Sequence, residues 1–547
     1  MDSDESPRVG GGGKFFDKRV PSGFTNRVIR VRYPLVGALL GALGFGLGQP
    51  SSAAPDTASP RAPEPPGAEA AAPPSSGAAT AVDDARRPVF SQALLRYRTR
   101  AQERILGRDQ AVEDEFGRVV PARQIVLDDG KSPPAKNGNE LGHFVPIENE
   151  PALAHFHQAL EELQREPEAK SKVRVAVYGA SHTQADIYSG YLRYYLQSRF
   201  GNGGLGFVPL GTDRGWAHRL DFKVKGRGFK VQYAQKRSVA RGGRFGLAGA
   251  AAVAGPHAWA RISPDNNTDP DLTASQYGLF YAAEPEGGDI AVSVDGDEPV
   301  ELPTRAAQLE PRYHTFERTL GWHQVEIRTL GSGSARLFGL SVERAQPGLV
   351  IDTMGIRGTR AANMLLWDQA LWEEHVRRRA PDLVLLAYGT NESTDRGQPI
   401  AEYSSELSRV LSRIRQALPE VSCVLVGPGD FPKAEGDTWI PRPRLLEIIH
   451  EQRRLAPEFG CGFWNTYEFM GGEGSMSEWA SSIPRMGSQD HIHLTARGYV
   501  RMGMVLGDAL MRAYDARHLP SDLRVASGRI SERTNSASQG AAAAASP

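Results

Sequence analysis

The chain has 547 residues, 40% of them hydrophobic, and its 64 basic and 64 acidic side chains cancel to a formal net charge of zero. This length exceeds what one hydrophobic core usually supports, so we expect two or more domains. The balanced charge argues against nucleic acid as the main partner, because neutralising phosphates requires a basic surface.

Residues 1–48 have the layout of an export signal. Basic residues lead to an apolar, uncharged run at 34–48, and small residues suited to cleavage follow at 51–54. The run is about 15 residues long, shorter than the ~20 that a spanning helix needs. A cleaved signal peptide and an uncleaved membrane anchor both stay open, and both place the rest of the chain outside the cytoplasm. The alternative is a buried or disordered Gly/Ala segment. We expect a protein of the periplasm or cell envelope.

Two segments lack any periodic apolar pattern. Residues 49–88 are rich in Pro, Ala and Ser, and residues 519–547 include an Ala run, so we predict a disordered linker and a disordered tail. Between them, 89–170 is predicted to be an N-terminal helical segment, because apolar residues recur at helical spacing over 90–106 and 151–165.

Alternating strand and helix patterns follow in two separate stretches. In 171–206, a β-branched run at 173–178 precedes a turn and an amphipathic helix at 186–200. In 349–518, strands at 349–353, 383–387, 423–426 and 463–466 alternate with helices, one of them through Met364, Trp367 and Leu371, and a last helix covers 495–514. This alternation predicts an α/β domain with a parallel, doubly wound sheet.

Residues 207–348 interrupt that domain with a different pattern. Short alternating segments such as 290–294 and 325–328 are separated by Gly, Asp and Pro, which predicts an all-β, sandwich-like insertion. Acidic and amide residues alternate at 265–271 as in a calcium loop, but Pro270 and Gln276 stand where that motif needs Gly and Glu, so a polar turn is expected. Three tryptophans, Trp216, Trp259 and Trp322, are suited either to core packing or to stacking on sugar rings.

The two cysteines, Cys423 and Cys461, lie in apolar, strand-like stretches. Buried free thiols are the favoured interpretation. An inter-strand disulfide is the alternative if the chain reaches an oxidising compartment.

Five residues lie where the α/β pattern predicts the edge of the sheet. Ser181, Gly358 and Asn391 follow three of the predicted strands, and Asp490 and His493 lie just before the last helix. Ligands of an open parallel sheet bind at the carboxyl ends of its strands. Each residue alone is readily explained as a turn or cap residue, but together they predict one site.

These residue types in this order are suited to acyl transfer. A serine hydroxyl is a weak nucleophile at neutral pH, so Ser181 needs a base, which we assign to His493. Asp490 can fix the tautomer of His493 and support its positive form. The backbone N–H groups of Ser181 and Gly358 and the amide of Asn391 are the expected oxyanion hole. We predict no cofactor and no metal.

The chain resembles the SGNH (GDSL) hydrolases in four blocks. Gly179-Ala180-Ser181, Gly358, Gly389-Thr390-Asn391 and Asp490-His491-Ile492-His493 are similar to blocks I, II, III and V of that family. The resemblance implies a flavodoxin-like three-layer sandwich with a parallel sheet, no metal, and the site roles given above. Ala180 departs from the family, which usually has an Asp there that helps to shape the turn.

Longer stretches are similar to the peptidoglycan O-acetylesterase branch of that family. The first stretch consists of residues 181–183 and 201–207. The second consists of residues 470–472 together with Ser475, Met476 and Trp479. Enzymes of that branch carry a carbohydrate-binding-like β-module after block I, and the insertion at 207–348 resembles it in position and character. The resemblance implies an exported serine esterase that removes O-acetyl groups from a cell-envelope polysaccharide such as peptidoglycan. A carbohydrate O-acetyltransferase with the same triad and a non-catalytic glycan-binding protein remain alternatives.

Overall fold

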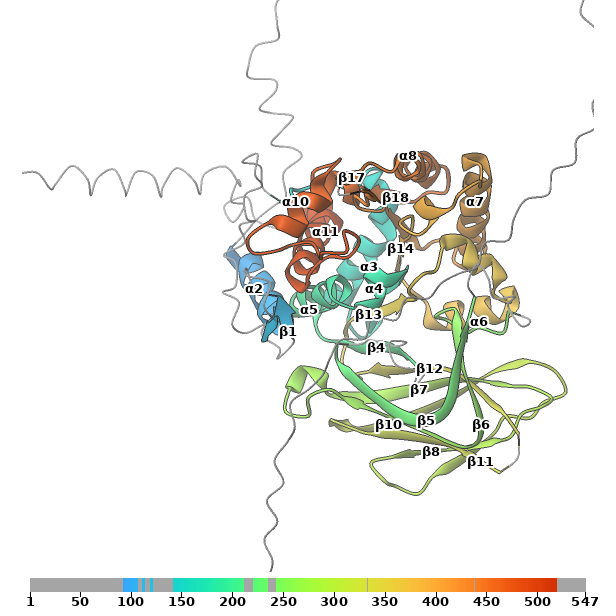
Figure 1. The fold of residues 1–547 in the computed structure, drawn as a ribbon. Helices are drawn as coiled ribbons and strands as arrows, with labels where there is room; N and C mark the ends of the chain where they lie inside the picture. Colours follow the sequence, from blue (N-terminus) through green and yellow to red (C-terminus); the bar gives the residue numbers. More distant parts are fainter. Residues whose placement is uncertain are drawn as a thin grey trace, which may run out of the picture. The chain divides into compact units, whose positions relative to one another are not determined.

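A computed structural model describes residues 92–106, 111–113, 119–121, 141–210, 220–234, 243–331, 333–436 and 438–518 (Figure 1). All of these belong to one structural unit, Pro74–Pro547. The predicted export segment at 1–48, linker at 49–88 and tail at 519–547 lie outside the described residues, as does Trp216. None of the helices in the described ranges has the length and apolar content that a membrane span requires.

The centre of the α/β domain is a five-stranded parallel sheet in the order β13-β3-β14-β15-β18. Its strands are β3 (Lys172–Gly179), β13 (Gly348–Gly355), β14 (Leu383–Ala387), β15 (Ser422–Val426) and β18 (Gly462–Trp464). Numbered along the chain, this order is 2-1-3-4-5, that of flavodoxin-like folds. The predicted α/β fold class is therefore confirmed.

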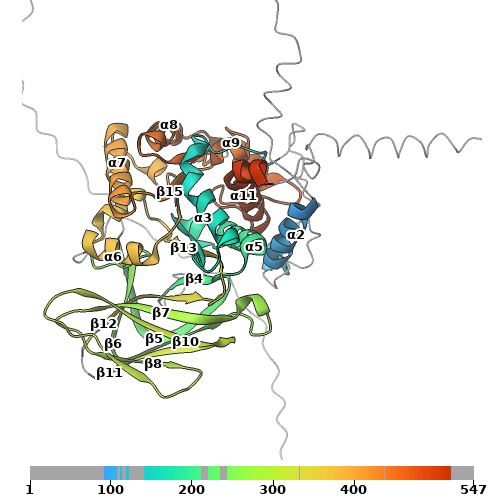
Figure 2. The same cartoon turned by 180° about the vertical axis from the view of Figure 1, so that it is seen from behind.

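Helices cover both faces of this sheet because alternate side chains of each strand point to opposite sides. Val173, Val175 and Val177 of β3 join a core that includes α2 (Gln92–Leu106), α3 (Ala154–Arg165), α5 (Tyr188–Phe200) and α11 (Ala496–His518). Ala176 and Tyr178 join the opposite core with α6 (Gln369–Arg379), α7 (Ile400–Ala417) and α8 (Pro443–Glu458). Figures 1 and 2 show these two helical layers with the sheet between them.

Short elements depart from the predicted ones. The helix expected through Met364, Trp367 and Leu371 is divided into the 3-10 helix η4 (Ala361–Leu366) and α6, because Asp368 caps a new helix by accepting a hydrogen bond from the Leu371 N–H at 2.8 Å. The segment 89–170 also contains a hairpin, β1 (Ala111–Glu113) with β2 (Val119–Pro121), and the 3-10 helix η2 (Glu150–Leu153). The remaining short elements are α4 (Ser181–Gln184), η5 (Glu392–Thr394), β16 (Lys433–Glu435), β17 (Thr438–Ile440), α9 (Thr466–Met470) and α10 (Ser475–Ser481).

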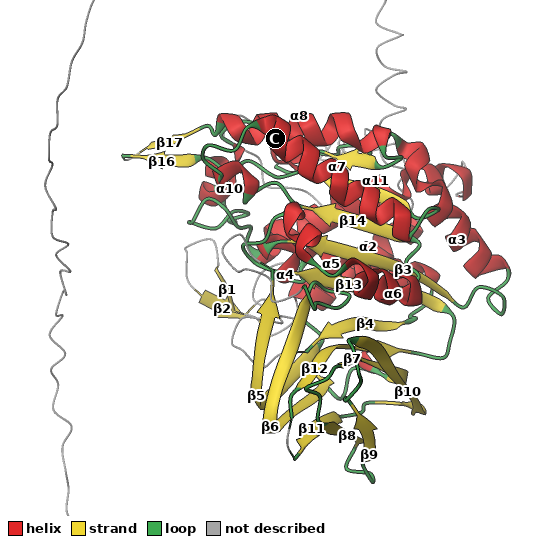
Figure 3. Ribbon diagram, turned by 90° about the vertical axis from the view of Figure 1, so that its right-hand side faces the viewer, coloured by secondary structure: helices red, strands yellow, loops and turns green. Residues whose placement is uncertain are grey.

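The insertion is all-β, as predicted, and the nine strands that the structure describes in it are antiparallel (Figure 3). The strands are β4 (Gly204–Pro209), β5 (Phe222–Tyr233), β6 (Ala250–Pro264), β7 (Ala274–Ala283), β8 (Asp289–Val294), β9 (Val300–Pro303), β10 (Glu310–Gly321), β11 (Val325–Leu330) and β12 (Ala335–Glu343), with one 3-10 turn, η3 (Pro270–Leu272). They form one continuous sheet, because β6 pairs with β12 near its start and with β11 further along. Side chains such as Ile290, Ile327 and Leu340 bury themselves in a separate core.

Ion pairs join the insertion to the α/β domain. Glu343, at the end of β12, accepts hydrogen bonds from Arg174 of β3 at 2.9 Å and from Arg379 of α6, and Arg379 also binds Asp352 of β13 at 2.7 Å. These groups are largely buried, so the junction is ordered by charge pairing as well as by packing.

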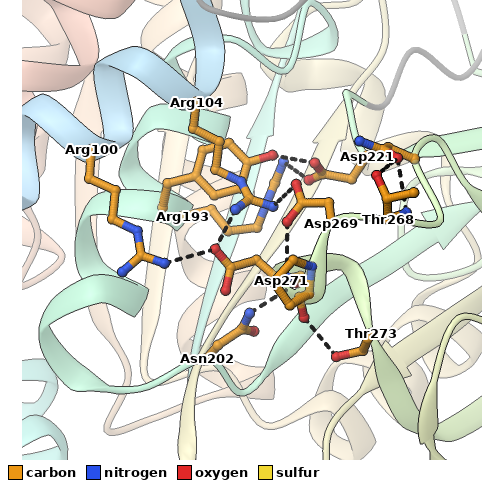
Figure 4. Close-up of polar contacts among 12 residues, drawn as sticks. Arg100, Arg104, Arg193, Asn202, Asp221, Thr268, Asp269, Asp271 and Thr273 are labelled. Atoms are coloured by element: carbon orange, nitrogen blue, oxygen red, sulfur yellow. Dashed lines mark hydrogen bonds and ion pairs between the residues drawn. The ribbon is translucent and has the colours of Figure 1, made fainter.

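A second junction involves α2 and the acidic loop at 265–271 (Figure 4). Arg104 pairs with Asp269 at 2.5 Å and with Asp271, and Arg100 reaches Asp271 at 3.3 Å. Two carboxylates of the loop that resembles a calcium motif, those of Asp269 and Asp271, are thus paired with arginine. The indole N–H of Trp322 donates to the Asp269 carbonyl at 2.8 Å, and this ring is 42% exposed rather than packed in the core.

Cys423 of β15 forms a disulfide with Cys461, the residue that directly precedes the neighbouring strand β18, and their Cα atoms are 4.6 Å apart. The favoured prediction of two free thiols is therefore wrong, and the alternative is the one observed. Sequence spacing could not decide between them, because the pairing depends on which strands are neighbours.

Candidate active site

The turn that presents Ser181 follows directly from β3. Gly179 ends the strand, Ala180 makes the turn, and Ser181 begins α4. A Cβ at Gly179 would clash with Thr183, and one at Gly355 of the neighbouring β13 would clash with the backbone of Gln184, so glycine is required at both positions. The turn is thus packed against the adjacent strand end, which fixes the position of the serine. Ala180 is buried there, at the position where the resembling family has Asp.

Ser181, His493 and Asp490 are joined by hydrogen bonds. The Oγ of Ser181 lies 2.9 Å from Nε2 of His493, and Nδ1 of His493 lies 2.6 Å from Oδ2 of Asp490. The other carboxylate oxygen of Asp490 accepts the backbone N–H groups of Ile492 and His493, each at 3.0 Å. The structure therefore brings together three residues that the sequence places up to 312 positions apart.

The electrostatics of Asp490 suit a carboxylate that stays ionised. Partial burial opposes the charge, but the hydrogen bonds from the His493 ring and the two backbone N–H groups outweigh it and lower the pKa of Asp490. The side chains of His493 and Asp490 are 37% and 46% exposed, so the site opens to solvent. An ionised Asp490 can hold Nδ1 of His493 protonated and leave Nε2 to accept a proton from Ser181.

The predicted oxyanion donors lie in two loops beside this turn. Gly358 has a left-handed φ of 76° in the loop after β13, whose Ile356 N–H bonds to the Gly179 carbonyl at 2.9 Å. Asn391 follows β14, and its side-chain N–H₂ donates to the Thr359 carbonyl at 2.9 Å, which joins the two loops. The amide retains a second N–H, and the first N–H groups of a helical turn such as α4 have no partner within it.

Glu392 supports these loops and was not singled out in the sequence. Its buried carboxylate accepts the N–H of Gly389 at 3.0 Å and the N–H of Ala361 at 2.9 Å. Burial raises the pKa of Glu392 above its usual value. Its position next to Asn391 was the only available signal, because both of its partners are backbone groups of loops that meet only in the fold.

His182 forms a wall of the site rather than a second base. Burial, together with the nearby His493, lowers the pKa of His182 to about 3, so the ring is neutral. Its Nδ1 lies 2.8 Å from the hydroxyl of Tyr499, and its ring centre lies 5.3 Å from that of His493. The side chain is thus held in place beside the base by Tyr499, another residue that the sequence did not reveal.

A small, mostly apolar cavity lies beside the triad at the ends of β14 and β15. It measures about 40 Å³, and its lining includes His182 next to Ser181 and Ile492 next to His493. A single water needs about 10–15 Å³ by this kind of measure, so the cavity has room for about three groups of that size.

This grouping has the parts that acyl transfer requires: a nucleophile bonded to a base, a group that orients the base, and donors for a developing oxyanion. Across the parts of the chain that the structure describes, no three His, Cys, Asp or Glu side chains come together as a metal-binding group. The fold and this grouping define the class, an ester-hydrolysing enzyme of the flavodoxin-like α/β type.

Comparison with known proteins finds one family match. Residues 321–501 match the model of the GDSL-like Lipase/Acylhydrolase family, the family that the motifs of the sequence resemble. The match begins inside the insertion and contains Gly358, Asn391, Asp490 and His493, whereas Ser181 lies before the insertion. No curated protein matches the sequence of the chain.

The chain is similar to several solved structures, and the first of these shares its fold. A peptidoglycan O-acetylesterase is 23% identical to this chain, with a TM-score of 0.55. The match covers 65% of this chain and 96% of the chain of that esterase. A family two carbohydrate esterase from Cellvibrio japonicus is 13% identical over 54% of this chain and 99% of its own, with a TM-score of 0.21. An acetyl xylan esterase is 16% identical over 29% of this chain and 80% of its own, with a TM-score of 0.24.

Proposed function

We propose that this protein is an exported serine esterase that removes O-acetyl groups from a cell-envelope polysaccharide such as peptidoglycan. The observation that carries the proposal is the hydrogen-bonded chain from Ser181 through His493 to Asp490. The fold shared with a peptidoglycan O-acetylesterase supports the substrate class. The insertion serves as a carbohydrate-binding-like module between the two parts of the hydrolase domain, 171–206 and 349–518.

In this mechanism, Ser181 attacks the ester carbonyl while Nε2 of His493 takes its proton. Asp490 holds the imidazole in the required tautomer and stabilises its positive form. The negative oxygen of the tetrahedral intermediate is held by the N–H groups of Ser181 and Gly358 and by the amide of Asn391. As the intermediate collapses, the C–O bond to the sugar breaks and His493 gives its proton to the leaving sugar oxygen, which departs as a hydroxyl. A water activated by His493 next releases acetate and frees the serine.

The dimensions of the site favour an acetyl group on a large alcohol. A cavity of about 40 Å³ accepts few heavy atoms, which suits acetyl better than a long acyl chain. The exposure of His493 and Asp490 leaves space for a polymer on the alcohol side of the ester.

Export is supported by two independent features. The layout of residues 1–48 is that of a secretory signal or anchor. The Cys423–Cys461 disulfide is of a kind that persists mainly in oxidising compartments.

Hydrolysis of p-nitrophenyl acetate by the wild-type protein and by Ser181→Ala tests the nucleophile. We expect the wild type to be active and the variant to lose at least 10³-fold in kcat. Equal rates in two folded proteins would refute the assignment. A second assay measures free acetate released from O-acetylated peptidoglycan. An esterase releases acetate, whereas an O-acetyltransferase transfers the acetyl group to an added sugar acceptor.

A further inference from the structure

A second pocket is partly lined by the loop that carries Asp490 and His493. It measures about 350 Å³ and is bordered by α10 and the loop that follows it. Its lining includes Ser477, Ser481, Ile483, Arg485, Gln489 and His491. The mechanism above uses none of these side chains.

Most of the groups that line this pocket are of the types that recognise sugar hydroxyls. Hydroxyl, amide and guanidinium groups come from Ser481, Gln489 and Arg485. In the amide orientation that suits its neighbours, the Gln489 oxygen accepts from Arg485 at 2.8 Å and the amide N–H₂ is directed away from that guanidinium. Ile483 is 69% exposed and gives the pocket one apolar edge. A mixture of polar groups and an apolar edge matches the two kinds of surface on a pyranose ring.

An exposed tryptophan adjoins the pocket through His491. Trp439 lies on the β16–β17 hairpin, which extends from the α/β domain near α10 (Figure 3). Its indole stacks on the His491 imidazole with ring centres 3.9 Å apart and planes 14° apart. Trp439 is nevertheless 41% exposed, so a large part of its surface is open to a ligand. Aromatic faces of this kind bind the apolar C–H face of a sugar.

His491 connects this surface to the catalytic loop. Its backbone has a left-handed φ of 54°, which is uncommon for a residue other than glycine. Its Nδ1 lies 3.3 Å from the Ser477 hydroxyl of α10. The ring is therefore held between Trp439 and α10, one residue from Asp490 and two from His493. This surface therefore includes a residue of the loop that carries two members of the triad.

From this arrangement we infer a sugar-binding subsite formed by Trp439, His491 and the pocket of Ser481, Arg485 and Gln489. It binds a hexose ring next to the acetylated sugar, so that the glycan strand extends past the triad on the Asp490 side. The inference rests on the proposed function and deepens it, because it explains how an open site selects a polymer over a small ester.

Kinetics of the full chain with a small and a large substrate test the subsite. The substrates are p-nitrophenyl acetate and O-acetylated peptidoglycan, and the variants are Trp439→Ala, Trp439→Phe and Gln489→Ala. We expect Trp439→Ala to lower kcat/KM for peptidoglycan at least tenfold more than for p-nitrophenyl acetate, mainly through KM. Gln489→Ala should shift the ratio in the same direction, and Trp439→Phe should retain most of the wild-type ratio.

Leu446→Ala is the matched control. Leu446 lies on α8 and is 44% exposed, so this variant also removes an exposed apolar side chain from the same domain. We expect the ratio of the two kcat/KM values to stay at the wild-type value. An equal loss on both substrates in Trp439→Ala, or the same change of ratio in Leu446→Ala, would overturn the subsite.

A binding measurement separates failure of the subsite from failure of the proposed function. Chitotetraose is titrated by calorimetry into Ser181→Ala protein, with and without Trp439→Ala, so that no turnover is needed. We expect the second substitution to weaken binding at least tenfold. Equal affinity would overturn the subsite even if the wild type is an active esterase, whereas an inactive wild type with a tenfold difference in binding would overturn only the esterase.

Discussion

The Cys423–Cys461 disulfide should make a large contribution to stability. The bond joins Cys423 of β15 to Cys461, just before β18, over a sequence separation of 38, and both side chains are buried. For a loop of this length the chain-entropy relation gives about 4 kcal/mol at 25 °C, a large fraction of the stability of a typical domain. We therefore expect Cys423→Ala with Cys461→Ala to lower the free energy of unfolding by about 4 kcal/mol.

Urea denaturation of the full chain, with and without reductant, measures this contribution. Reductant should lower the unfolding midpoint of the wild type and leave that of the double variant unchanged. Cys423 is the second residue of β15 and Cys461 directly precedes β18, whereas the active site lies at the carboxyl ends of the strands. Hydrolysis of p-nitrophenyl acetate at 25 °C should therefore stay within about twofold of the wild type. A difference in unfolding free energy below about 1 kcal/mol, or a wild type insensitive to reductant, would refute the reasoning.

Three further predictions concern the oxyanion donors, the nucleophile turn and the domain junction. Asn391→Ala removes one oxyanion donor and should lower kcat for p-nitrophenyl acetate by about 10²–10³-fold with little change in KM; a loss below tenfold would contradict its role. Gly355→Ala places a methyl group against the backbone of Gln184 and should lower kcat at least tenfold. Circular dichroism can verify that the variant remains folded. A variant with the kinetics of the wild type would show that the turn adapts to the methyl group. Burial opposes ionisation of Glu343, but Arg379 and Arg174 lower its pKa to about 2. Its carboxylate therefore stabilises the fold above a pH of about 4.3, and this contribution is lost as the pH falls towards 2. The contribution is about 3 kcal/mol, and urea denaturation from pH 6 to pH 2 should show it in the wild type and not in Glu343→Gln.

The α/β domain was predictable because its strands are buried on both faces and therefore read as apolar runs. The predicted strand at 173–178 is β3, with a difference of one residue at each end, and the predicted strand at 383–387 is β14, with the same bounds. The candidate site could be predicted for a related reason. In a parallel sheet the residues after each strand share one edge, so Ser181 and Asn391 could be placed together without knowing the strand order.

Features that depend on the fold itself could not be predicted. The partners of Glu392 are backbone groups of separate loops, and the disulfide depends on β15 and β18 being neighbours. The acidic pattern at 265–271 could be seen in the sequence, but its partner could not, because Arg104 is more than 160 residues away. Trp439 and His491 were missed since neither belongs to a periodic element, and only the hairpin brings them into contact.

The wide separation of Ser181 and His493 has a consequence for chain synthesis. The serine turn is complete early, but its base lies 312 residues further on, beyond the whole insertion and immediately before α11. Contacts between such distant segments form slowly, because a long loop must close before any contact compensates for the lost entropy. A nascent chain that ends before residue 493 carries the serine without its general base. During synthesis, ester hydrolysis would therefore begin only after the segment that carries His493 has packed against the serine turn.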